Sequence, residues 1–202
     1  MNNYLIDQSP SKALVRFSIP MIIASFFQQI YTIVDSAVVG KFVGEKALAS
    51  IGASFALTTI FICIAIGGGV GASVVISRYF GKKDYPRMKL AIYTAIFSFL
   101  ILSILLSLFS LIFSKEILVI LNTPEDVLDL AIIYLDIYFY GLPFLFMYNI
   151  ISSLFNSLGE SKIPLYFLIF SSTLNVFLDI YFVRDLGFGI KGAAYATLLA
   201  QG

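Results

Sequence analysis

The sequence contains no histidine and no tryptophan, and its single cysteine is Cys63. Without histidine, the chain has no histidine proton relay, no histidine-bound metal and no serine–histidine catalytic pair. One cysteine cannot form an internal disulfide, and its place in an apolar run is typical of a small packed residue. Charge is scarce as well. Only 12% of residues are charged and the net charge is +1, which gives no electrostatic basis for binding nucleic acid.

Apolar residues are abundant instead. They make up 59% of the 202 residues, and the mean hydropathy is +0.95. This excess is too large for one buried core, whereas a bilayer span needs only about 20 apolar residues. We therefore predict an all-α, multi-pass membrane protein. The expected spans are residues 14–39, 47–77, 90–113, 124–158, 163–183 and 190–202. The last is too short to cross a bilayer, so we expect the chain to be a fragment of a longer protein.

Local features predict how these spans begin, bend and pack. The glycines of residues 67–71 offer a bend in the long second span, and Pro143 offers a kink in the fourth. Thr123 as N-cap and Pro124 as first helical residue predict the start of the fourth span. Residues 115–121 are expected to form a short amphipathic stretch before it. Small residues at a spacing of four predict close helix packing: Gly67 and Gly71; Gly189, Ala193 and Thr197; Gly192, Ala196 and Ala200.

The basic residues predict the orientation of the chain. With alternating spans, one side of the membrane collects Lys12, Arg16, Arg78, Lys82, Lys83, Arg87, Lys89 and Lys162. The other side collects Lys41, Lys46, Lys115, Arg184 and Lys191. Because the positive-rich side is normally cytoplasmic, we expect a cytoplasmic N-terminus in the cell (plasma) membrane. The Gly40–Gly44 segment lacks the Gly-Lys-Ser/Thr ending of a phosphate loop, so nothing indicates direct coupling to ATP.

Three carboxylates lie within or near the expected spans: Asp35, Asp136 and Asp179. An acid near the middle of a span costs at least about 2.5–3.5 kcal/mol on insertion scales, which usually marks an interior cavity or an ion route. For Asp136 the simpler interpretation, a solvated carboxylate near the membrane surface, is favoured. Asn175 and Asp179 are four residues apart and share one helix face. Their oxygens can coordinate Na⁺, and the carboxyl can equally carry a proton, so both ions stay open.

Four loop segments, taken in order, resemble the multidrug and toxic compound extrusion family. They are Asp35–Ala49 after the first span, Ile76–Asp84 after the second, Asn156–Pro164 before the fifth and Gly187–Thr197 at the start of the sixth. The resemblance covers almost the whole chain. It implies a twelve-helix transporter made of two six-helix lobes, and this chain would be most of the N-terminal lobe. The C-terminal lobe would then be a partner missing from this sequence.

The resemblance also implies a function and a site. Members of the family expel cationic or amphipathic drugs in exchange for H⁺ or Na⁺, so small organic cations and membrane lipid are the expected partners, with no other cofactor or metal. The cation site that it implies matches Asp35, Asn175, Asp179 and Thr197, with Tyr134 preferred over Tyr138 and Tyr140 as the tyrosine of the fourth span. Gln28 fits as a neighbour that lines the substrate cavity.

Two other functions are alternatives to drug export. A lipid-linked saccharide flippase of the same superfamily would carry a groove rich in arginine and lysine, and no basic residue falls in the interior of an expected span. An intramembrane aspartyl protease would use Tyr-Asp and Gly-x-Gly-Asp sequences. The aspartates here follow Val34 and Leu178 instead, so we expect no enzymatic activity.

Overall fold

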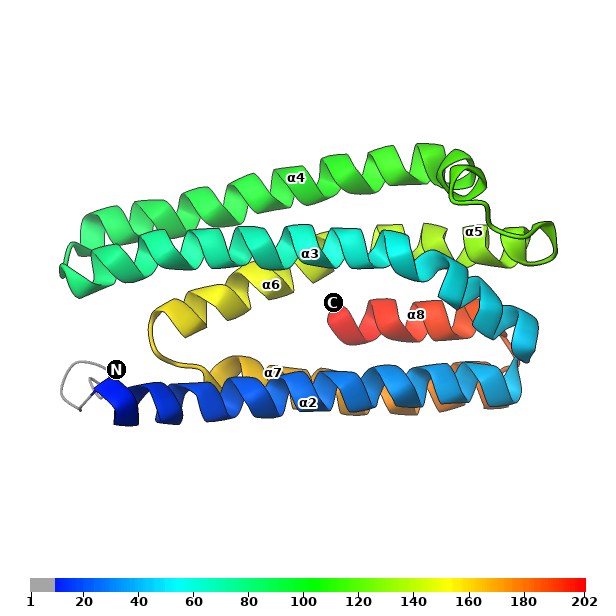
Figure 1. Cartoon of the computed structure of the whole chain (residues 1–202), viewed down its shortest axis with the longest axis horizontal. Coiled ribbons are helices and arrows are strands. Elements are labelled where there is room, and N and C mark those ends of the chain that lie inside the picture. The colour runs from blue at the N-terminus through cyan, green and yellow to red at the C-terminus, as the bar shows by residue number, and fades with distance from the viewer. Residues whose placement is uncertain (1–9) are drawn as a thin grey trace.

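The computed structural model describes residues 10–202 as a bundle of helices (Figure 1). No strand occurs in that part of the chain. The elements are α2 (Pro10–Phe42), α3 (Glu45–Gly81), α4 (Tyr85–Ile120), α5 (Glu125–Tyr140), α6 (Leu142–Ser157), α7 (Lys162–Asp179), the π-helix η1 (Ile180–Asp185) and α8 (Ile190–Gln201).

The helices run alternately between two ends of the bundle. Figure 1 shows α2 and α7 side by side, with α8 between this pair and α5, while α3 packs against α4, α5 and α6. The N-terminal end of α2, the α3–α4 loop and the α6–α7 loop lie at one end. All eight basic residues assigned to one side by the sequence therefore gather at the same end of the bundle.

The predicted spans correspond to these helices. Four helices in the described residues are long and apolar enough to cross a membrane: α2, α3, α4 and the continuous α7–η1 segment. The fourth expected span forms two helices, α5 and α6, which are bent by 49° and count as a fifth crossing if taken together. The break lies at Gly141, and Pro143 occupies the first turn of α6, two residues after the break rather than at it. Helix α8 is too short to span, as expected.

The glycines of the second span do not form the bend expected of them. Helix α3 stays helical from residue 67 through 71, and Figure 1 shows its curvature near its N-terminal end instead. In place of a bend, Gly68 faces the ring of Phe99 and Gly69 faces α6, where an added Cβ would lie 3.2 Å from the carbonyl oxygen of Asn149. These glycines therefore admit neighbouring helices, because a membrane helix keeps its backbone hydrogen bonds unless another partner replaces them.

The predicted cap of the fourth span is wrong. The helix begins at Glu125, so Pro124 is the N-cap and Thr123 lies one position outside, and no side chain caps the helix. The short stretch expected at residues 115–121 corresponds to the helical piece that follows a kink at Phe113 and ends α4 at Ile120. Of the small-residue pairs, Gly67 and Gly71 have no described neighbour within 4 Å of an added Cβ, whereas Gly192 packs against the backbone of Phe182.

Two apolar clusters position the site. The first joins α3, α4, α5 and α6 through Leu57, Phe61, Ala65, Leu118, Ala131, Leu135, Phe139, Leu142 and Phe146. The second joins α2, α3, η1 and α8 through Val38, Val39, Ala47, Val183, Ile190 and Ala193, and Tyr134 of α5 packs against it. Large apolar side chains cover much of the outer surface, as expected for a surface in contact with lipid.

Candidate functional site

The site is built around two buried polar residues of α7, Asn175 and Asp179. Only 1% of Asn175 and 0% of Asp179 is exposed. They lie one turn apart, so their side chains share the face that α7 turns toward α2 and α8. Asp179 is the last residue of α7, and the wider turns of η1 begin directly after it. Such π-helical turns often occur at functional positions.

Asp35 of α2 completes a carboxyl pair with Asp179. Asp35 is half-buried, and its carboxyl group lies within hydrogen-bonding reach of the Asp179 carboxyl. Two charged carboxylates at this distance repel each other, so a shared proton or a bound cation stabilises the arrangement. Both acids lie late in their expected spans. The structure brings them together because α2 and α7, although far apart in the sequence, run side by side from the same end of the bundle.

The amide of Asn175 connects Asp179 to Thr197 of α8. In one orientation, the Nδ2 atom donates to the Thr197 hydroxyl at 3.3 Å. Rotated by 180°, Nδ2 donates to Asp179 Oδ2 at 2.7 Å, and the amide oxygen accepts from the Thr197 N–H at 3.2 Å. The second orientation satisfies both ends of the amide and is therefore favoured. Three of the residues expected from the resemblance thus form one connected cluster.

The structure adds Tyr31, a residue that the sequence analysis missed. Tyr31 lies one turn before Asp35 on α2, and its hydroxyl is within hydrogen-bonding reach of Thr197. The same side chain lies near Asp179 and Tyr138. Its spacing of four residues from Asp35 was the available signal. That signal was weak, because tyrosines also occur at membrane interfaces and in packed cores.

Tyr134, one of three candidate tyrosines on the fourth span, lies near both carboxyl groups of the site. Its neighbours include Asp35, Tyr31, Tyr138 and Asp179. Tyr138 is half-buried and close to Tyr134, whereas Tyr140 is exposed. Tyr134 therefore lies beside the carboxyl pair and Tyr140 lies apart from it, and the role of Tyr134 in the site stays a prediction.

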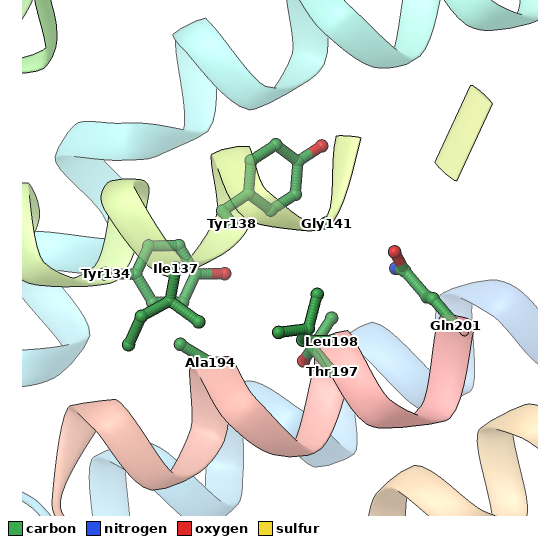
Figure 2. Close-up of a pocket in the computed structure, with 8 residues that line it drawn as sticks. All are labelled: Tyr134, Ile137, Tyr138, Gly141, Ala194, Thr197, Leu198 and Gln201. Atoms are coloured by element: carbon green, nitrogen blue, oxygen red, sulfur yellow. The ribbon is translucent and has the colours of Figure 1, made fainter. Parts of the chain in front are cut away.

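A small cavity lies between α5 and α8, next to these residues (Figure 2). It has room for about one water molecule, and it is lined by Tyr134, Ile137, Tyr138, Gly141, Ala194, Thr197, Leu198 and Gln201. Figure 2 shows the hydroxyl of Tyr134 and the amide of Gln201 pointing into the space between the two helices. Thr197 belongs both to this cavity and to the carboxyl cluster, so the two are continuous.

Two residues considered from the sequence lie apart from the cluster. Gln28 is on the exposed surface of α2, and its backbone carbonyl accepts a hydrogen bond from Thr32 at 3.0 Å. Its role as a cavity-lining residue stays a prediction. Asp136 is half-buried on α5, where its Oδ1 atom is buried without a partner among the described residues.

The chemistry of the cluster suits a proton or a hard cation. Its polar atoms are oxygens of two carboxyls, an amide and three hydroxyls, and Asp35 Oδ1 and Asp179 Oδ1 are buried without a hydrogen-bond partner among the described residues. Oxygen ligands are those that Na⁺ and other hard cations prefer. No group of three histidine, cysteine or acidic side chains that could hold a metal ion occurs within residues 10–202.

Comparison with protein families matches residues 20–181 to the MatE family model. The chain belongs to the MatE family. Among curated relatives, it is 35% identical to the probable multidrug resistance protein YpnP of Bacillus subtilis, over 95% of this chain and 43% of the relative. It is 32% identical to the probable multidrug resistance protein YoeA of the same species and 29% identical to the multidrug export protein MepA of Staphylococcus aureus. These two alignments cover 97% and 98% of this chain and 44% of each relative.

Comparison with solved structures also relates this MatE chain to transporters. It superposes with a TM-score of 0.92 and 30% identity on a multidrug resistance MATE family transporter in an outward-facing conformation. The same score and identity relate it to a MOP superfamily transporter from Pyrococcus furiosus. Both alignments cover 98% of this chain and 44% of the other. The chain therefore spans less than half the length of the relatives that it matches.

The family membership confirms several predictions. The chain is an all-helical, multi-pass membrane protein with the fold of one lobe of a MATE transporter. Its relatives are transporters and not enzymes, so the intramembrane protease is set aside.

Proposed function

We propose that the chain forms the N-terminal lobe of a secondary transporter that exports cationic or amphipathic drugs in exchange for H⁺ or Na⁺. The carboxyl pair of Asp35 and Asp179 carries this proposal. The pair joins α2 to α7, and it lies in a cluster with the amide of Asn175 and the hydroxyl of Thr197. The multidrug export function named for MepA and the transporter fold support the same reading.

The proposed mechanism depends on charge repulsion at this pair. Without a bound proton or Na⁺, the two carboxylates repel each other across the contact between α2 and α7. Binding of the ion removes that repulsion and lets the helices pack more closely. Helix α2 is exposed along most of its length, so it is less constrained by packing than α3, α5 or α6. We expect α2 to be the element that moves and so to change the drug-binding cleft between the lobes.

The proposed substrates are organic cations that enter from the cleft. The cavity that Tyr134 and Tyr138 line has room for only about one water molecule, so we expect the organic cation to bind in the cleft between the lobes and not in this cavity. The saccharide flippase stays the alternative function, and a groove between the lobes that is rich in arginine and lysine would favour it. Lipid and a second lobe of six helices are the other proposed partners, with no cofactor beyond the coupling ion.

The proposed location is the plasma membrane, with the N-terminus in the cytoplasm. The support is the gathering of basic residues at the end of the bundle that holds the N-terminal end of α2 and the α3–α4 loop. That end would face the cytoplasm. Asp35 and Asp179 both lie near the C-terminal ends of their helices, away from that end, so the carboxyl pair would lie in the outer half of the lobe.

The test is ion-driven efflux by the full-length transporter in vesicles loaded with a fluorescent organic cation. Replacing Asp179→Asn keeps the size of the side chain but removes its charge. We expect the variant to insert and fold but to lose efflux driven by either an H⁺ or a Na⁺ gradient. The Ser103→Ala variant is the control, because the Ser103 hydroxyl bonds only to Leu100 of its own helix. Wild-type efflux by Asp179→Asn would overturn the proposed function.

A further inference from the structure

The break between α5 and α6 leaves the backbone carbonyl of Phe139 without its usual helical donor. In an α-helix, the carbonyl of Phe139 would accept from the N–H of residue 143. Residue 143 is a proline and has no N–H. The N–H of Gly141 lies toward the carbonyls of both Phe139 and Tyr138, and its hydrogen bond is to Tyr138 at 2.9 Å. In the interior of a membrane protein no bulk water can replace the missing donor, so another group must supply it.

Ser107 of α4 supplies that donor. Its hydroxyl donates to the carbonyl oxygen of Phe139 at 2.7 Å, across 32 residues of sequence, and both residues are buried. Its neighbour on the same face behaves differently, because the hydroxyl of Ser103 donates to Leu100 within α4 at 2.8 Å. Ser107 therefore bonds to the broken span, while Ser103 provides a buried serine without that contact.

The hydrogen bond acts on a residue whose side chain is also held firmly. The ring of Phe139 is fully buried and packs edge-to-face on Phe61, with ring centroids 5.6 Å apart. Its carbonyl is fixed by Ser107 at the last turn of α5. The backbone at the end of α5 is thus anchored to α3 through a ring and to α4 through a hydroxyl.

This anchor lies next to the tyrosines of the candidate site. Tyr138 directly precedes Phe139, and Tyr134 lies one turn earlier on α5. Both line the cavity against Thr197, and Tyr134 lies near Asp35 and Asp179. Because a helix is stiff over one or two turns, the direction of the end of α5 determines where these rings point.

We propose that Ser107 is a positioning residue for the coupling site. Its hydroxyl holds the Phe139 carbonyl, which has no N–H donor from Pro143, and so fixes the 49° bend between α5 and α6. This contact directs Tyr134 and Tyr138 toward the carboxyl pair. The proposal rests on the proposed function, because it concerns the ion site at Asp35 and Asp179. It gives α4, a helix without a charged residue in its span, a defined part in coupling.

The first experiment measures efflux by the full-length transporter as the concentration of the driving ion is varied. In Ser107→Ala, the ion concentration for half-maximal efflux should rise about ten-fold, the factor that corresponds to one lost buried hydrogen bond. Ser107→Thr keeps the hydroxyl and should stay within about two-fold of the wild type. Ser103→Ala should do the same. An unchanged ion dependence in Ser107→Ala would overturn the proposal.

The second experiment tests whether the effect passes through the released carbonyl. Pro143→Ala returns an N–H four residues after Phe139, so the first turn of α6 offers this carbonyl a backbone donor. In this background, Ser107→Ala should shift the ion dependence by no more than about two-fold, and the double-mutant cycle should show strong coupling. If Ser107→Ala has the same effect in both backgrounds, Ser107 contributes only by packing and the proposal fails.

The third experiment separates this proposal from the proposed function. Spin labels on cysteines at the exposed positions Asp129 of α5 and Ile151 of α6, in a Cys63→Ser background, report the bend without any transport. Ser107→Ala should broaden the distance distribution, and Ser103→Ala should leave it unchanged. An unchanged distribution in Ser107→Ala overturns the positioning role. Broadening together with wild-type efflux by Asp179→Asn would instead leave the hinge contact standing and overturn the ion site.

Discussion

The hydroxyl of Tyr31 lies within hydrogen-bonding reach of the hydroxyl of Thr197, and this contact joins α2 to α8 beside the carboxyl pair. Thr197 also meets the amide of Asn175 on α7. Three helices from distant parts of the sequence therefore converge on one threonine. A shift of α2 relative to α7 changes these contacts, which links the position of α2 to the state of the site.

Removing the Tyr31 hydroxyl tests this link. In Tyr31→Phe the ring still fills its place, but the contact with Thr197 is lost, at a cost of about 1 kcal/mol. We expect ion-driven efflux of a fluorescent cation to slow by about five- to ten-fold in the full-length transporter. Tyr181→Phe is the matched control, because Tyr181 is exposed on η1. Equal efflux by the two variants would show that the Tyr31 hydroxyl has no part in coupling.

The orientation of the lobe can be tested with single cysteines. Lys83 lies exposed in the α3–α4 loop, and Lys46 lies exposed near the start of α3 at the other end of the bundle. In a Cys63→Ser background, an impermeant thiol reagent added to intact cells should label Lys46→Cys and not Lys83→Cys, because a basic loop stays in the cytoplasm. Permeabilised cells should show labelling of both. Labelling of Lys83→Cys alone in intact cells would reverse the proposed orientation.

Two glycine substitutions should shift stability in opposite directions. A Cβ added at Gly192 would lie 3.0 Å from the carbonyl carbon and 3.1 Å from the carbonyl oxygen of Phe182, so α8 must move away from η1. We expect Gly192→Ala to lower the unfolding free energy by about 1–3 kcal/mol. Gly67→Ala meets no described atom within 4 Å and should stabilise α3 by up to about 1 kcal/mol through helix propensity. Thermal unfolding in detergent measures both, and a destabilised Gly67→Ala would reveal a neighbour at that face.

The spans could be predicted because each is a property of its own residues. A run of about 20 apolar residues has a favourable transfer free energy wherever it lies in the fold, so hydropathy places α2, α3, α4 and α7 correctly. The pairing of Asn175 with Asp179 is likewise local, since four residues make one helical turn.

Features that depend on neighbouring helices were harder to predict. The role of the glycines near Gly68 depends on Phe99 of α4, and nothing in the second span alone shows whether a glycine bends a helix or admits a neighbour. Tyr31 joins the site only because Thr197 lies opposite it. The role of Ser107 could not be predicted for the same reason. Pro143 indicates that a carbonyl loses its N–H donor, but only the fold shows which helix supplies another donor.

The choice among the tyrosines of the fourth span provides the sharpest test of the site. Tyr134 lies near Asp35, Asp179 and Tyr31, whereas Tyr140 is exposed on the same helix. Tyr134→Phe keeps the ring against the second apolar cluster and removes the hydroxyl that points into the cavity.

We therefore expect Tyr134→Phe to slow ion-driven efflux by about ten-fold, because it removes a hydroxyl from the neighbourhood of Asp35 and Asp179. Tyr140→Phe should remain within about two-fold of the wild type, because Tyr140 is exposed and does not line the cavity. The measurement is efflux of a fluorescent cation from vesicles, with equal protein in each sample. A larger loss in Tyr138→Phe than in Tyr134→Phe would move the assignment to Tyr138, since that ring lines the same cavity.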